Sequence, residues 1–79
     1  MAEEITAEEI ARHYEHAGHS VTLVNELVAL SERSAYETDR LLRNVRHLEL
    51  MVAKDYWTTE DLTPFNEAIT AGRAVLPTE

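Results

Sequence analysis

The stretch TAEEIARHYEHAGHSVTLVNELVAL, residues 6–30, predicts the element on which the rest of this small chain packs. Within it, mostly apolar residues follow one another at spacings of 4, 3, 4, 3 and 4; they are Ile10, Tyr14, Ala17, Val21, Val24 and Val28. Because an α-helix turns once every 3.6 residues, these side chains share one stripe. Thr6 and Glu9 have the spacing of a capping box at its start. We therefore predict a long helix over residues 7–32.

Gly18 is the residue most able to interrupt this helix. Glycine inside a helix costs up to about 1 kcal/mol relative to alanine. Ser20 could cap a second helix after such an interruption. The apolar stripe keeps its phase across Gly18, so we expect one continuous helix, with a break near residues 18–20 as the alternative.

Two shorter helices are predicted to follow. Ser34-Ala35-Tyr36-Glu37 is a second capping box, and the helix that it begins, over residues 35–53, has an inner face of Leu41, Val45, Leu48 and Val52. Thr63-Pro64 has the form of an N-cap followed by proline at the first helical position, which predicts a third helix over residues 63–76. The fold class is then all-α, a three-helix bundle with a long first helix and a single domain over residues 1–79.

The segment KDYWTTEDLTPF, residues 54–65, lies between the second and third predicted helices. Thr58 or Thr59, followed by acidic residues, could cap one helical turn. We interpret the segment as a corner, in which Tyr56, Trp57 and Phe65 close one end of the bundle with apolar rings.

Composition limits the class of protein. A chain of 79 residues without cysteine has neither disulfides nor thiolate sites. Its net charge of −8 opposes direct binding to nucleic-acid phosphates. The first residues lack the pattern of a signal peptide, and no apolar run approaches the roughly 20 residues of a membrane span. We expect a soluble intracellular protein that binds neither nucleic acid nor membranes directly.

The sequence contains no recognisable catalytic or metal-binding motif. His13, His16 and His19 are spaced like helical metal ligands, but they spread over about 120° outside the apolar stripe, and we expect no metal or cofactor. Glu49, at the edge of an inner face, is expected to pair with an arginine. We therefore predict that the protein is not an enzyme.

Apolar residues outside the core stripes predict a protein-contact surface. Three leucines in residues 21–30 form a second stripe roughly 100–160° from the first. On the second helix, apolar side chains lie among basic ones, a composition typical of protein interfaces. The predicted interface residues are Leu23, Leu27, Leu30, Tyr36, Arg40, Arg43, His47, Leu50 and Met51. We expect this surface to hold a homo-oligomer, because exposed apolar area is costly in water. The alternative is that the third helix covers the second stripe internally.

The second half of the chain, RNVRHLELMVAKDYWTTED at residues 43–61 and LTPFNEAITAG at residues 62–72, resembles short uncharacterised helical proteins encoded by tailed bacteriophages. The resemblance implies a phage accessory or virion-associated protein, in the host cytoplasm or the virion, and transfers no functional residue. Two functions remain open. One is a non-enzymatic structural or assembly module that acts through helix-mediated protein contacts. The alternative is a small acidic inhibitor that mimics nucleic acid on a host protein.

Overall fold

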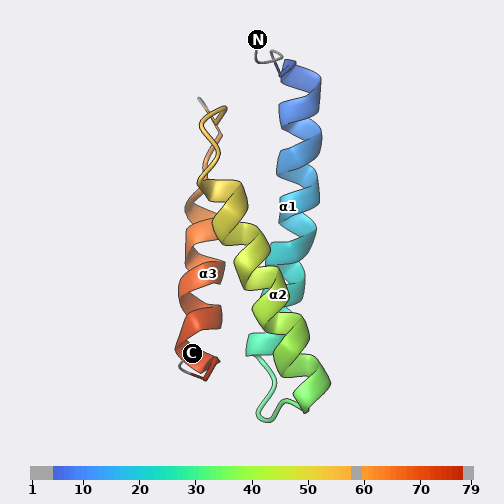
Figure 1. The fold of residues 1–79 in the computed structure, drawn as a ribbon, viewed down its shortest axis with the longest axis vertical. Coiled ribbons are helices and arrows are strands. Elements are labelled where there is room, and N and C mark those ends of the chain that lie inside the picture. Colours follow the sequence, from blue (N-terminus) through green and yellow to red (C-terminus); the bar gives the residue numbers. More distant parts are fainter. Residues whose placement is uncertain (1–4, 58–59, 78–79) are drawn as a thin grey trace.

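The computed structural model describes residues 5–57 and 60–77, which form three helices packed as a bundle. The helices are α1 (Ala7–Val28), α2 (Ala35–Val52) and α3 (Thr63–Val75). α2 runs antiparallel to both α1 and α3, and each pair of helices is in contact (Figure 1). The predicted all-α three-helix architecture with a long first helix is confirmed.

α1 is continuous across Gly18, as the phase of its apolar stripe predicted. At its start the Glu9 amide donates to the Thr6 hydroxyl oxygen at 3.1 Å, which confirms Thr6 as the N-cap. The Glu9 carboxylate accepts from the Thr6 hydroxyl at 3.2 Å, whereas in a complete capping box it would accept from the Thr6 amide.

The predicted end of the first helix, residue 32, is wrong, since α1 ends at Val28. The guanidinium of Arg33 turns back onto the end of α1. Its Nη1 atom donates to the carbonyl oxygens of Leu27 at 3.1 Å and Leu30 at 2.9 Å. A cation beside the carbonyl end of a helix satisfies acceptors that have no partner within the helix and favours its dipole. The chain can therefore leave the helix four residues earlier than the sequence pattern predicted.

We expect Arg33→Ala to lower the free energy of unfolding by about 1–2 kcal/mol, because hydrogen bonds from a charged group and the favourable helix dipole are lost together. Urea unfolding followed by circular dichroism measures the change. Arg33→Lys is the matched control, since it keeps the cation and loses the planar donor group. Equal stability of the parent and the alanine variant would show that the contact contributes nothing.

α2 begins with the complete capping box that the sequence predicted. The Ser34 amide donates to Glu37 Oε1 at 2.9 Å, and the Glu37 amide donates to Ser34 Oγ at 3.1 Å. Hydrogen bonds from the Ser34 backbone and side chain hold the pKa of the Glu37 carboxyl below its ordinary value. The helix ends at Val52, one residue before the predicted position.

The corner between α2 and α3 contains a cluster of aromatic rings, as predicted. The Trp57 ring lies edge-on to the rings of Tyr14 and Phe65, with centroids 6.1 and 6.4 Å away. The Trp57 indole N–H donates to the Met51 carbonyl oxygen at 2.7 Å, and the Tyr14 hydroxyl donates to the Asp61 carbonyl oxygen at 2.7 Å. The corner is thus fixed to the end of α2 and to the middle of α1. Thr58 and Thr59, the predicted caps of one turn, lie outside the described residues.

α3 begins at Thr63, as predicted, but its N-cap is one residue earlier than the predicted N-cap, Thr63. Leu62 occupies the N-cap position, so Thr63 is the first helical residue and its hydroxyl is not the cap. Instead, the Thr63 amide donates to Asp61 Oδ1 at 3.0 Å. Hydrogen bonds from the Thr63 side chain and backbone hold the pKa of the Asp61 carboxyl below its ordinary value. α3 ends at Val75, one residue before the predicted end.

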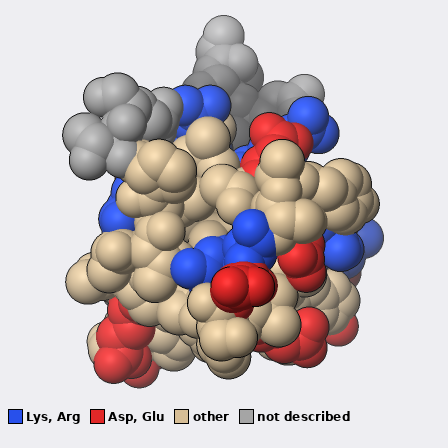
Figure 2. All heavy atoms as spheres, turned by 90° about the horizontal axis from the view of Figure 1, so that it is seen from below, with Lys and Arg blue, Asp and Glu red and all other residues tan. Residues whose placement is uncertain are grey.

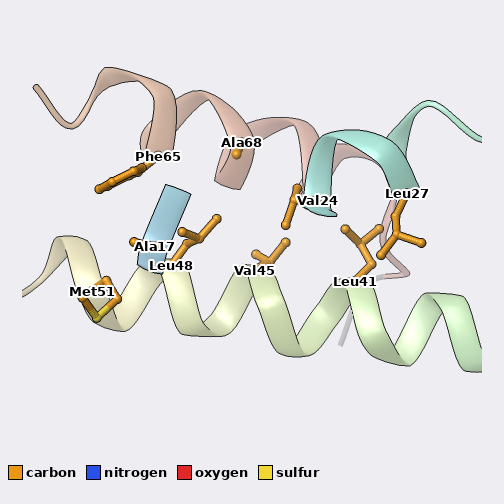
Figure 3. Packing of buried hydrophobic residues seen from close by; sticks show 9 residues of the cluster. All are labelled: Ala17, Val24, Leu27, Leu41, Val45, Leu48, Met51, Phe65 and Ala68. Carbon is orange, nitrogen blue, oxygen red and sulfur yellow. The ribbon is translucent and has the colours of Figure 1, made fainter. Parts of the chain in front are cut away.

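One hydrophobic core joins the three helices, with side chains from α1 and α2 facing each other beneath α3 (Figure 3). α1 contributes buried residues only from Ala17 onwards. Gly72 of α3 is buried where all three helices meet. A Cβ atom added there would collide with Val45 Cγ2 and would lie 3.5 Å from Val24 Cγ1. The absent side chain of Gly72 therefore allows α3 to pack this closely.

Candidate functional site

Five predicted interface residues of α2 form one stripe opposite its buried face, with His47 half-buried and the other four exposed. Tyr36, Arg40, Arg43, His47 and Leu50 follow one another at spacings of 4, 3, 4 and 3, so they lie above one another on the helix surface. Tyr36 is 71% exposed and Leu50 is 68% exposed, the two highest values among the large hydrophobic residues identified as exposed. We call these five residues the α2 outer stripe. It carries an apolar side chain at each end and basic side chains between them.

The α2 outer stripe lies in residues 35–55, a segment of the acidic chain in which four acidic and four basic residues balance. The protein has seven lysine and arginine residues, and four of them are Arg40, Arg43, Arg46 and Lys54. The Arg43 guanidinium forms an exposed ion pair with Asp39, with Nε and Oδ2 2.9 Å apart. Figure 2 looks at the molecule from the end with the α1–α2 turn, where basic and acidic atoms lie side by side.

The structure corrects the predicted placement of Leu27 and Met51 on an outward surface. Leu27 is 6% exposed and Met51 is 9% exposed, and both belong to the core of the single chain. Figure 3 shows Leu27 pointing towards Leu41 of α2. Leu23 is half-buried against the same core, and Leu30, beyond the end of α1, is 39% exposed. The second stripe of α1 is thus largely covered within the chain. The predicted alternative was that the third helix alone covers this stripe, but Leu27 points towards α2.

The three histidines of α1 do not share one set of contacts, because His13 contacts the corner while His16 and His19 lie beside each other. The His13 ring stacks on Tyr56 with centroids 5.7 Å apart, and the rings of His16 and His19 are 6.2 Å apart. Burial raises the pKa of the Tyr56 hydroxyl. Among residues 5–57 and 60–77, no three histidine or carboxylate side chains gather as a candidate metal site.

Glu49 forms the expected pair with an arginine. Arg73 Nη2 lies 2.7 Å from Glu49 Oε1, and Arg73 Nε lies 3.1 Å from Oε2, so the two groups meet through two parallel hydrogen bonds. This geometry gives directional contacts between a guanidinium and a carboxylate. The pair joins α2 to α3 and borders an open hollow of about 480 Å³ beside Leu50. One end of the α2 outer stripe is therefore next to an ion pair that joins α2 to α3.

Comparisons with family models, with curated proteins and with solved structures find no match for this chain. In the described part of the chain, no helix is both long and apolar enough to span a bilayer. The candidate site therefore depends on the geometry of the α2 outer stripe. The sequence predicted all five of its residues but combined them with core residues of α1 and α2.

Proposed function

We propose that this protein is a non-enzymatic structural or accessory module that contacts another protein through the α2 outer stripe. The observation that supports the proposal is the exposure of Tyr36 and Leu50 at the two ends of that stripe. A single exposed leucine is ordinary on a protein surface. Tyrosine and arginine are among the residues enriched at interface anchors, and here Tyr36 is aligned with two arginines and a second exposed apolar side chain.

The fold does not require these side chains to be apolar. Arg40 and Arg43 are exposed, and neither Tyr36 nor Leu50 belongs to the core or to the side chains packed against it. A polar residue at either exposed position would leave the buried contacts of α2 in place. The two apolar side chains therefore add an association surface to an otherwise complete bundle.

A homo-oligomer is the second form of this proposal. The sequence pattern predicted a homo-oligomer held by a surface shared by α1 and α2. The burial of Leu27 removes the central residue of the α1 side of that surface. Two copies of the α2 outer stripe related by a two-fold axis near Arg43 would bring Arg43 against its own copy. Like charges facing each other destabilise a contact. We therefore favour a different protein as the partner.

The alternative function, an acidic inhibitor that mimics nucleic acid, requires a continuous row of carboxylates. On α1 the exposed residues Glu8, Glu15 and Glu26 share one side, but the exposed residues Arg12 and His19 interrupt them. This interruption favours the contact module. The resemblance to short proteins of tailed bacteriophages adds the proposal that the module works in an infected host cell or in the virion.

Site-specific photocrosslinking in the cells that make the protein tests the proposed contact. A photoreactive amino acid replaces Tyr36 or Leu50 in separate variants, and Val75, a 36% exposed residue of α3, is the matched control position. We expect both α2 positions to give adducts with the same protein and position 75 to give none. Adducts that form equally well from position 75, or from none of the three positions, would contradict the proposal.

A further inference from the structure

We propose that the α2 outer stripe binds an acidic amphipathic helix of another protein, with two apolar residues of that helix against Tyr36 and Leu50 and carboxylates against Arg40 and Arg43. This inference rests on the proposed function and specifies the chemistry of the partner. Tyr36 and Leu50 are two heptads apart on α2, a separation of about 21 Å along the axis at 1.5 Å per residue. A partner helix can place its own apolar residues at the same repeat.

Charge complementarity identifies the partner as acidic. Between its two apolar ends the α2 outer stripe presents Arg40, Arg43 and His47, and Lys54 follows just beyond the end of α2 at Val52. Asp39 compensates part of this charge through its pair with Arg43, whereas the other two carboxylates of α2, Glu37 and Glu49, lie outside the stripe. The net charge of −8 is spread over the chain, and screening at physiological ionic strength reduces its effect beyond about 8 Å. Carboxylates laid along α2 therefore interact mainly with the local basic residues.

Two other occupants fit less well. A second copy of α2 would bring arginines together, and the exposed side of α1 has carboxylates but, apart from alanines, no exposed apolar residue to meet Tyr36 or Leu50. A nucleic acid offers phosphates, yet its charge extends well beyond one helix face and would meet the acidic remainder of the protein. A short acidic helix matches both the apolar ends and the basic centre.

The test uses fluorescence anisotropy of synthetic helical peptides of about three heptads at about 0.15 M salt. The acidic peptide has leucines two heptads apart on one stripe and glutamates between them. One control has lysine in place of each glutamate, and a second has serine in place of each leucine. We expect the acidic peptide to bind at least about tenfold more tightly than either control. A single-stranded DNA oligonucleotide is included as a phosphate probe.

Charge exchange on the protein makes the test specific. The double variant R40E/R43E should lose the acidic peptide and bind the lysine peptide instead, while circular dichroism confirms that the helices remain. If that variant does not fold, R40Q/R43Q should weaken binding of the acidic peptide about tenfold. The matched control R12Q changes an exposed arginine of α1 and should leave binding unchanged.

Each contrary outcome has a definite meaning. Binding of the lysine peptide to the parent protein, or DNA binding that depends on Arg40 and Arg43, would overturn the inference. So would self-association of the parent that Leu50→Ser abolishes, because the occupant would then be a second copy. If no peptide binds while crosslinks still form from positions 36 and 50, the inference of an acidic partner helix is wrong and the proposed contact function stands. If neither peptides nor crosslinks are found, both proposals fail.

Discussion

Trp57→Ala should lower the free energy of unfolding by about 3 kcal/mol, at the lower end of the range for truncating a large core aromatic residue. The indole ring is half-buried against the core and contacts the rings of Tyr14, Tyr56 and Phe65. Its N–H also donates to the Met51 carbonyl oxygen at the end of α2. The substitution removes both the apolar contacts and this hydrogen bond. Stability of small domains is roughly 0.05–0.15 kcal/mol per residue, so the loss is a large fraction of the total.

Urea unfolding followed by far-ultraviolet circular dichroism measures the effect without depending on tryptophan fluorescence. Trp57→Phe is the matched control, because it keeps an aromatic ring and removes the indole donor. We expect this control to cost about 1 kcal/mol, since the Met51 carbonyl oxygen also accepts from the Lys54 amide at 3.1 Å. A loss below about 0.5 kcal/mol for Trp57→Ala would match an ordinary surface substitution and would mean that the ring does not support the fold.

Gly72→Ala should destabilise the bundle by roughly 1–3 kcal/mol, although alanine is the better helix former by up to about 1 kcal/mol. The added methyl group would collide with Val45 Cγ2 and would lie 3.7 Å from Leu41 Cδ1. Valine in a helix has one strongly preferred rotamer, so Val45 cannot easily turn away. α3 would have to move outward from α1 and α2, which loosens contacts along its length.

Gly18→Ala provides the opposite result in the same protein. An added Cβ at Gly18 would have no neighbour within 4 Å, so the substitution gains helix propensity without a collision. We expect it to raise the free energy of unfolding by up to about 1 kcal/mol. Chemical denaturation of both variants gives the comparison. If Gly72→Ala were as stabilising as Gly18→Ala, the conclusion that the three helices pack closely at Gly72 would be wrong.

The sequence predicted the features that depend on local chemistry. The three helices, the Ser34 capping box and the continuity across Gly18 follow from periodicity and from hydrogen bonds between residues close in sequence. The end of α1 was less predictable, because Arg33 stabilises it from outside the helix. Likewise Leu62 rather than Thr63 occupies the N-cap position of α3, and the amide of Thr63, the first helical residue, donates to Asp61 Oδ1.

The candidate site was predicted only in part because helical spacing does not show which side of a helix its neighbours cover. Leu27 and Met51 lie off the main apolar stripes, yet packing among three helices buries both. Tyr36 and Leu50 also lie off those stripes, but they stay exposed because they are farther around α2 from its core side. Helical spacing also does not reveal the role of Gly72 in close packing, because that role depends on the distance between helices, which one sequence does not contain.

The bond between the Tyr14 hydroxyl and the Asp61 carbonyl oxygen joins residues 47 positions apart and has a consequence for the order of folding. Helical turns form from neighbouring residues within about a microsecond, whereas a contact between distant residues must overcome the entropy of closing the intervening loop. Trp57, the single tryptophan of the chain, lies beside Tyr14 at this junction. In a stopped-flow or temperature-jump experiment, circular dichroism follows the helices, while tryptophan fluorescence follows the step at which the chain closes on itself.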